Sequence, residues 1–381
     1  MISIENVFAY TGRIFGDELH MARLNSISNA VTATLQADSL AISAIGRALG
    51  EARGIRTKHG IKQIDRLLSN NGIDLEGFFF PKWVKFLVAE RSEIVVALDW
   101  TDFDRDGHTT LAIHLITRHG RASALIWKTF PKTGLKGNRN DYEDELLVLF
   151  KKCLPKNVKV TLLADRGFAD VKLYAFLREL GFDFIIRFKG NTIVTQKNLR
   201  QKKLAKAWLL PDGEANQLFD VEVTSEGYYL PAFVCVHDTD MKDAWFLAVS
   251  NQSLTASHAV KLYGRRFSIE EKFRDIKDMR YGMGLSTVRI SSTRRRDRLL
   301  FLCAVATTLL TLLGAAGESI GLDRYMKANT SKKRTHSLLF QGSHYFACIP
   351  KMRETDLLPL LDKYKELLRE HMVFSGIFGL I

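Results

Sequence analysis

The sequence predicts a mixed α/β fold in which helices cover a central sheet. Between residues 93 and 191, strand-like apolar segments and amphipathic helices follow one another in the order β-β-β-α-β-α-β. The chain before residue 85 has helical periodicity, and residues 192–252 are mostly strand-like and polar. An antiparallel meander followed by crossover units requires parallel neighbours, so the middle of the chain should form one mixed sheet.

The first element is a helical region that ends near residue 85. Its segments SNAVTATL and LAISAIGRAL carry apolar residues at spacings of three and four, and Asp38 and Ser39 are suited to cap the second of them. Between Arg47 and Arg66 there are six basic and two acidic residues. That excess fits a DNA-reading face and a solvated charged surface equally well.

The next elements form the predicted sheet. EIVVALDW reads as a buried strand, and two further strands follow it, joined by a hairpin at His119-Gly120. A helix is expected to begin at Asp141, and a second helix, after the strand KVTLLA, should end at Gly181. FDFIIRFKG is the last strand of this predicted sheet.

Beyond this sheet the pattern becomes more basic. Seven basic and no acidic residues lie between 187 and 206, at the start of the strand-rich segment. Residues 255–279 predict one long helix, and residues 357–372 predict an amphipathic helix that covers a core or contacts a second subunit. Residues 299–317 carry no charge and follow RRRDR, which is typical of a membrane span. Three threonines and the lack of a second such segment favour a buried core helix instead.

Composition narrows the functional classes. The chain has 381 residues, and its 55 basic residues outnumber its 42 acidic ones, which gives a net charge of +13. Such an excess predicts an acidic partner, most often nucleic acid or an anionic membrane. The alternative is a basic but otherwise ordinary enzyme. Its 46% hydrophobic content argues against general disorder. Four well-separated cysteines form no CxxC motif, which favours a reducing cytoplasm. There is no phosphate-binding loop, so no nucleotide cofactor is expected.

Two aspartates stand where strands of the predicted sheet end. Asp99 follows a run of apolar residues in the first strand, and Asp165 follows TLLA in the fourth. A buried carboxylate is costly unless it is neutralised, and these two strands should be parallel neighbours. The aspartates are therefore expected to converge and to share a divalent cation. The alternative is that each caps a turn.

The segment YGRRFSIEEKFRDIK offers a third ligand. Tyr263, Arg266, Glu270 and Lys277 are spaced by three, four and seven residues, which keeps them near one face of a helix. Glu270 would bind metal, Arg266 and Lys277 would hold phosphate oxygens, and Tyr263 would donate a hydrogen bond. The alternative is a helix with many surface ion pairs.

Two other patterns, one acidic and one rich in histidine, do not predict a metal site. DFDRDG begins like a calcium loop, but Ile113 stands where a bidentate glutamate is required. His108, His114 and His119 are spread along a strand and its turn, and they do not predict a metal site.

These motifs together resemble the DDE transposases of bacterial insertion sequences. The pattern Y-x2-R-x3-E-x6-K resembles the Tyr-Arg-Glu-Lys signature of the insertion-sequence-four family. The likeness extends over nearly the whole chain, through the segments RLNSISNAV, TKHGIKQIDRLLSN, LDWTD, YGMGL and residues 328–331.

The resemblance implies a division of the chain. A helical DNA-binding domain would occupy residues 1–85, and a ribonuclease H-like core would comprise residues 90–191 and 253–317. A mostly β insertion at residues 192–252 would interrupt that core, and a C-terminal helical region at 318–381 would be able to dimerise.

It also implies a chemistry. Asp99, Asp165 and Glu270 would be catalytic and would hold two Mg²⁺ ions, for which Mn²⁺ can substitute. The enzyme would nick double-stranded DNA at terminal inverted repeats, form a hairpin and insert the freed end into target DNA, which is cut-and-paste transposition. A homodimer would synapse the two ends, in the bacterial cytoplasm at the nucleoid and without a membrane.

The same resemblance assigns the DNA contacts. Trp245 would stack on a base forced out of the hairpin, while Tyr263 and Arg266 would hold the adjacent phosphate. Lys277 and Arg166 are further expected DNA contacts. Two other functions remain open on the sequence, a nuclease of the same fold without strand transfer and an inactive DNA-binding regulator.

Overall fold

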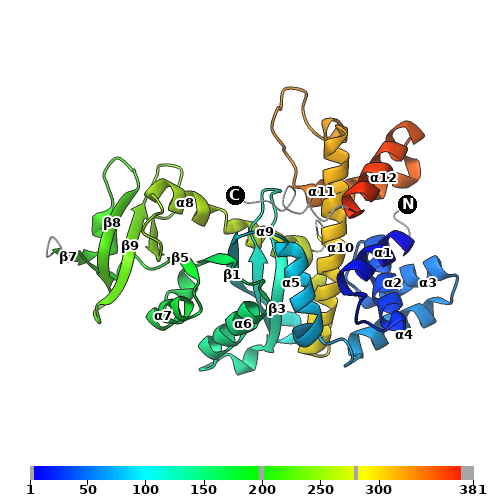
Figure 1. Ribbon diagram of the computed structural model, residues 1–381, viewed down its shortest axis with the longest axis horizontal. Helices are drawn as coiled ribbons and strands as arrows, with labels where there is room; N and C mark the ends of the chain where they lie inside the picture. Colours follow the sequence, from blue (N-terminus) through cyan, green and yellow to red (C-terminus); the bar gives the residue numbers. More distant parts are fainter. Residues whose placement is uncertain (1–3, 197–200, 279–281, 370–381) are drawn as a thin grey trace.

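The computed structural model describes residues 4–196, 201–278 and 282–369 (Figure 1). Four sequence predictions extend outside the described residues: part of the basic run at 197–200, Met279 of the expected long helix, Tyr281 of YGMGL, and residues 370–372 of the expected last helix. The mixed α/β fold is confirmed, and its centre is one ten-stranded sheet in the order β3-β2-β1-β4-β5-β10-β9-β8-β6-β7. The strands are β1 (Glu93–Phe103), β2 (His108–Leu115), β3 (Ser123–Pro131), β4 (Lys159–Ala164), β5 (Asp183–Arg187), β6 (Ile193–Gln196), β7 (Gln201–Leu204), β8 (Asn216–Val223), β9 (Tyr228–Val236) and β10 (Trp245–Val249).

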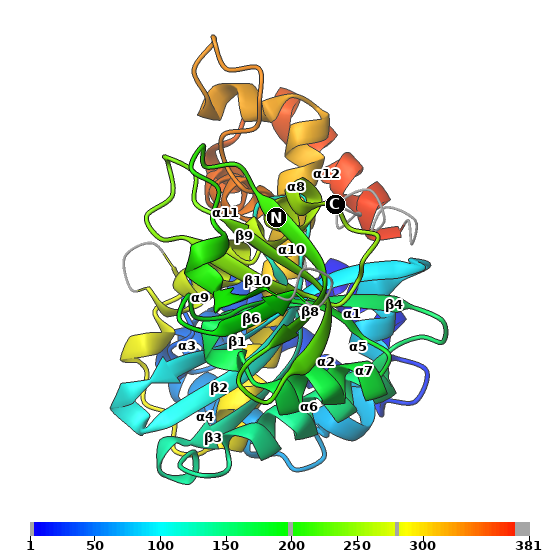
Figure 2. The same ribbon diagram turned by 90° about the vertical axis from the view of Figure 1, so that its left-hand side faces the viewer.

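Helices surround this sheet and extend beyond it (Figures 1 and 2). They are α1 (Ile4–Phe15), α2 (Met21–Ala37), α3 (Ile42–Arg53), α4 (Thr57–Ser69), α5 (Phe80–Val88), α6 (Arg139–Cys153), α7 (Val171–Glu179), α8 (Ala256–Gly264), α9 (Phe267–Lys277), α10 (Thr293–Ser319), α11 (Leu338–Cys348) and α12 (Glu354–Arg369).

The first five strands have the predicted order and direction. β1 to β3 form an antiparallel meander, in which β1 pairs with β2 and β2 with β3. β4 then pairs with β1 in parallel, and β5 pairs with β4 in parallel. The helices α6 and α7 form the crossovers that these parallel pairs need. As a result, the carboxyl ends of β1 and β4 meet at one edge of the sheet.

The strand-rich segment after residue 192 continues this sheet. β10 pairs antiparallel with β5, and β9, β8, β6 and β7 add to it in turn. In Figure 1 these strands extend the sheet away from the N-terminal helices. β10 is followed in the chain by α8, so its pairing with β5 brings the start of α8 close to the first five strands.

The predicted long helix at 255–279 is wrong in one respect, because the chain forms two helices there. α8 ends at Gly264 and α9 begins at Phe267. Across the break, the amides of Arg265 and Arg266 bond to carbonyls three residues earlier, so the α-helical pattern tightens and stops. Gly264 favours the break, since glycine is a weak helix former and here lies against the Trp245 ring.

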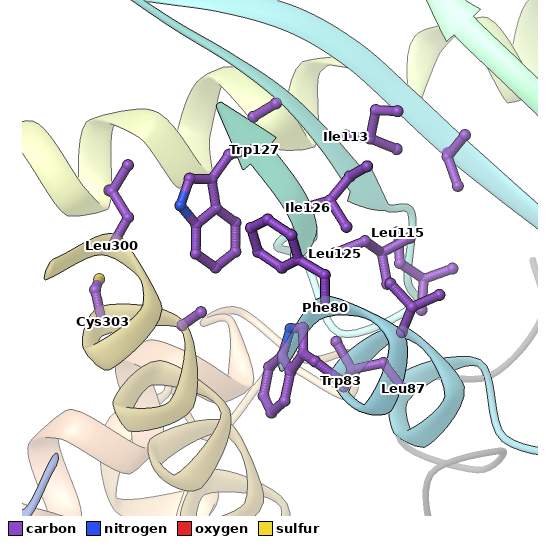
Figure 3. Packing of buried hydrophobic residues seen from close by; sticks show 14 of the residues in the cluster. Phe80, Trp83, Leu87, Ile113, Leu115, Leu125, Ile126, Trp127, Leu300 and Cys303 are labelled. Carbon is purple, nitrogen blue, oxygen red and sulfur yellow. The ribbon is translucent and has the colours of Figure 1, made fainter. Parts of the chain in front are cut away.

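The apolar segment at 299–317 lies inside α10, as the core-helix interpretation predicted. Among the described residues, α10 is the one helix long and apolar enough to cross a membrane, and its apolar window is entirely buried in the fold. It packs against β3, α2, α11 and α12. Figure 3 shows Leu300 and Cys303 of α10 facing the aromatic side chains of β3 and α5. Nothing in this burial indicates a membrane protein.

The basic residues before that segment are structural. Arg296 is fully buried, forms an ion pair with Asp106 and lies over the Phe103 ring. Arg298 is also buried and donates to the Leu68 carbonyl at 2.8 Å. These arginines therefore join elements of the fold and do not form a solvated positive flank.

The last described helix, α12, covers a core. Leu360, Tyr364, Leu367 and Leu368 are buried in α12, which packs against α10. The Arg13 side chain of α1 donates to the Arg369 carbonyl at 2.6 Å, so the first and last helices are in contact.

Candidate active site

Asp99 and Asp165 lie side by side on the sheet. The parallel pairing of β1 with β4 ends at Leu98 and Ala164, and the two aspartates are the next residues on their chains. The residues two positions earlier, Ala97 and Leu163, are buried on the sheet face that α8 and α9 cover. Because side chains alternate along a strand, both aspartates belong to that face. The predicted convergence is therefore present.

Asp99 differs from expectation in one detail. It does not end its strand, because β1 continues to Phe103 while paired with β2 alone. The extension of β1 beyond β4 leaves Asp99 beside an open position of the sheet. The strand thus holds the Asp99 backbone rigidly while its carboxylate remains half-buried.

Asp165 begins the turn that follows β4. Its Oδ1 accepts the Gly167 amide at 2.8 Å, so the capping interpretation is also correct. A side chain at position 167 would meet that oxygen at 3.0 Å, which explains the glycine in Asp-Arg-Gly. Arg166, the residue between them, is exposed on the 3₁₀ turn.

Arg266 contacts two carboxylates, those of Asp99 and Glu270. Its guanidinium lies 3.3 Å from an Asp99 oxygen and also forms an ion pair with Glu270 one turn later. The Arg266 side chain is only 6% exposed, whereas that of Glu270 is 49% exposed at the surface of α9. The break between α8 and α9 places Arg266 at the start of α9, where it reaches both acids.

The electrostatics of Asp99 are strongly perturbed. Burial raises the Asp99 pKa to about 6, Arg266 opposes that rise, and the charges of Asp165 and Glu270 add to it. The three acids therefore repel one another within one site. A carboxylate cluster of this kind is expected where a cation or a phosphodiester is handled.

Aromatic side chains form the wall next to Arg266. Trp245 contacts Tyr263 edge-on at 4.9 Å between ring centroids and lies 6.2 Å from the Phe267 ring. The Arg266 guanidinium lies over Tyr263 and Phe267, at 5.9 and 5.1 Å. Tyr263 is fully buried, Trp245 is half-buried and Phe267 is exposed. Trp245, Tyr263 and Arg266 thus come together, as the sequence predicted.

Lys277 ends α9 and lies beside the part of β1 that follows Asp99. Its ammonium is 3.2 Å from the Thr101 hydroxyl and lies 5.4 Å from the Phe103 ring centroid. Burial lowers the Lys277 pKa, and Asp102 and Asp104 counteract this. Lys277, the last residue of α9, is therefore held against the part of β1 that follows Asp99. Among the described residues, no contact joins its side chain to Glu270.

Sequence reasoning missed a supporting pair behind the aspartates. Glu143 of α6 is buried and accepts hydrogen bonds from Trp100 at 2.8 Å and from Arg139 at 2.9 Å. Arg139 in turn lies over the rings of Trp100 and Phe168. Trp100 follows Asp99 and Phe168 closes the Asp165 turn, so Arg139 links the two segments. In the sequence, Glu143 stands at helical spacing among the apolar residues of α6, and this position could have revealed the Glu143–Arg139 pair.

The donor set suits a hard divalent cation, since three carboxylates offer only oxygen ligands. In the part of the chain that the structure describes, no three acidic, histidine or cysteine side chains form a ready-made metal-binding group. Arg266 forms ion pairs with both Asp99 and Glu270, so its positive charge lies between them. The residues present fit a metal by their chemistry, with Arg266 acting as the counter-ion in this arrangement.

Comparison with known proteins gives the family. Residues 90–309 match the family model of the transposase DDE domain, which is more than half of the 381 residues. A search of curated proteins gives no match. The matched region begins just before β1 and ends within α10, so it contains both aspartates, the strands β6 to β10 and Glu270. The chain therefore belongs to the transposase DDE domain family, a family of DNA-cleaving enzymes that act on DNA as their partner.

Proposed function

We propose that this transposase performs cut-and-paste transposition of an insertion sequence, as a member of the insertion-sequence-four family. The observation that carries the proposal is the site itself. Asp99 and Asp165 adjoin on parallel strands, and Arg266 connects Asp99 to Glu270. The strand order of β1 to β5 supports a ribonuclease H-like core, interrupted by the insertion between β5 and α8.

Asp99, Asp165 and Glu270 are the proposed catalytic residues and metal ligands. They would hold two Mg²⁺ ions, which Mn²⁺ can replace. Such a pair of ions supplies activation of the attacking oxygen and stabilisation of the leaving oxygen of a phosphodiester. The chain's own contribution is to fix the carboxylates, on a rigid strand, on a capped turn and on the first turn of α9.

Arg266 and Tyr263 are proposed to bind the DNA phosphate beside the carboxylates. The buried Nε of Arg266 has no hydrogen-bond partner among the described residues. A buried donor without a partner costs free energy, and a phosphate oxygen would satisfy it. Lys277 and the exposed Arg166 would extend this contact along the DNA backbone.

Trp245 is proposed to hold a base that a DNA hairpin forces out of its stack. Its indole is half-buried and rests edge-on against Tyr263, with the exposed Phe267 ring beside it. Base stacking on such a surface tolerates any sequence, because every base has a π-face.

The remaining proposals concern assembly. Residues 1–85 would bind the terminal inverted repeats, and residues 318–381 would contribute to a homodimer that synapses two ends. Residues 90–191 and 253–317 would form the catalytic core, and residues 192–252 the insertion.

The experiment that tests the proposal uses Asp165→Ala in the full chain. We expect loss of Mg²⁺-dependent nicking of DNA that carries the flanking repeats, with unchanged binding of the same DNA. Persistent nicking would refute the metal assignment. A wild-type protein that nicks DNA but never joins the cut end to a target would instead be a nuclease.

A further inference from the structure

The helices α3 and α4 form a pair of the helix-turn-helix kind. α3 ends at Arg53 and α4 begins at Thr57, with Gly54 in the left-handed conformation between them at φ 63°. The two helices cross closely, since a side chain at Gly60 would meet the Gly46 carbonyl at 2.1 Å. Two helices joined by a short turn that contains glycine are a common DNA-binding arrangement.

One face of α4 is exposed and basic. Lys58, His59, Lys62, Gln63 and Arg66 are all exposed, and their spacing places them on a single stripe of the helix. The opposite face is apolar and is buried against the rest of the N-terminal helices. The three cations of the stripe, Lys58, Lys62 and Arg66, form no ion pair with a carboxylate among the described residues.

The one acidic residue of α4, Asp65, is exposed beside this stripe and is held in an ion pair with α10. Asp65 bonds to Arg295 of α10 at 2.6 Å, and Arg295 also contacts the Asp65 carbonyl and the Ser69 hydroxyl. The negative charge of Asp65 is thus already neutralised. The same contacts fix α4 to α10, the helix that packs beneath the sheet.

A groove beside the stripe is lined by neutral and basic hydrogen-bonding side chains. It is lined by Asn25, Ser26 and Asn29 of α2 together with Arg53, Gln63 and Arg66. Arg53 bonds to Gln63 across the two helices at 3.0 Å. No aspartate or glutamate is among the described residues that line it. Amide, hydroxyl and guanidinium groups are those that contact phosphates and base edges.

From these observations we infer that α4 is the helix that enters the major groove of duplex DNA. This inference rests on the proposed function and names the element that recognises the DNA. Lys58, Lys62 and Arg66 bind phosphates, while His59 and Gln63 read base edges. The major groove of B-form DNA admits a helix, whereas the deep groove of A-form RNA does not. Double-stranded DNA is therefore the partner that this face fits.

The first test compares two triple variants of the full chain for binding to a labelled duplex of random sequence. Lys58→Ala/Lys62→Ala/Arg66→Ala should weaken binding at least about tenfold and reduce the salt slope by about 2.7, because three phosphate contacts are lost. The control, Lys152→Ala/Lys156→Ala/Lys159→Ala, removes the same charge at exposed positions near the start of β4, away from Asp165. It should leave binding close to wild type. Equal effects of the two variants would overturn the inference.

The second test separates sequence reading from charge. His59→Ala/Gln63→Ala should retain binding to random duplex and change the sequences selected from a randomised duplex pool. An unchanged selected sequence would contradict base reading by α4. If wild-type protein binds and nicks duplex DNA while the lysine-arginine variant binds normally, only this inference fails. If wild-type protein binds no duplex, the proposed function fails with it. Unchanged thermal unfolding of each variant confirms that the fold is intact.

Discussion

The buried pair behind the active site yields the sharpest prediction. Arg139→Met removes the cation that faces Glu143 and preserves much of the apolar stem over Trp100. The Glu143 side chain is only 6% exposed, so its charge would then depend on the Trp100 donor alone. Burial already raises the Glu143 pKa, and the bonds from Trp100 and Arg139 hold it down.

The expected loss of stability in Arg139→Met follows from how exposed the Arg139 and Glu143 side chains are. Exposed ion pairs contribute up to about 1 kcal/mol, and breaking a fully buried pair costs about 3–5 kcal/mol. The Arg139 side chain is 45% exposed while Glu143 is buried, which places this pair between those limits. We expect Arg139→Met to lower the free energy of unfolding by about 2 kcal/mol at pH 7.

A second substitution distinguishes a buried charge from lost packing. Glu143→Gln retains an acceptor for the Trp100 indole and removes the negative charge. In the Arg139→Met background it should restore at least about 1 kcal/mol, whereas alone it should destabilise the protein. Urea denaturation of the four proteins measures this coupling. Additive losses would refute the account, because the pair would then carry no interaction of its own.

Three further predictions concern other parts of the molecule. Gly342→Ala should destabilise the fold by at least about 2 kcal/mol, since the new Cβ would lie 1.8 Å from the Leu310 carbonyl on α10. Thermal or urea unfolding measures this loss, and a neutral effect would disprove the close crossing of α10 and α11. Burial lowers the pKa of His114 and of His119 to about 3, so below pH 6.5 the unfolded state binds more protons. Stability should therefore fall as the pH drops, by up to about 1.4 kcal/mol per unit for each imidazole, and a flat profile between pH 6.5 and 4 would contradict this. Trp245→Ala should reduce hairpin formation far more than first-strand nicking, because stacking of the extruded base is worth about 1–3 kcal/mol, whereas Trp245→Phe should retain part of it.

The parts of the fold that the sequence predicted were those encoded locally. The apolar runs before Asp99 and Asp165 mark two strands, and the crossover helices require those strands to be parallel. The uncharged run at residues 299–317 predicted the buried helix that the structure shows as α10. Such signals depend on periodicity, which a single sequence contains.

The features that escaped prediction depend on contacts between distant segments. The break at Arg265–Arg266 has no proline to mark it, and it is stabilised by Arg266 binding Asp99, 167 residues away. The partners of Arg295 and Arg296 lie in α4 and beside β1, so a run that reads as a basic flank is an anchor. Periodicity within one segment contains no information about such pairings.

The central claim is that three carboxylates from β1, the turn after β4 and α9 act together on DNA. Its most direct test is transfer of a labelled, pre-cut element end into a supercoiled plasmid, with and without Mg²⁺. The wild-type chain should join the end only with Mg²⁺, and Asp99→Asn, Asp165→Asn and Glu270→Gln should each abolish joining while still binding the end. Joining by any of these three variants at the wild-type rate would contradict the account.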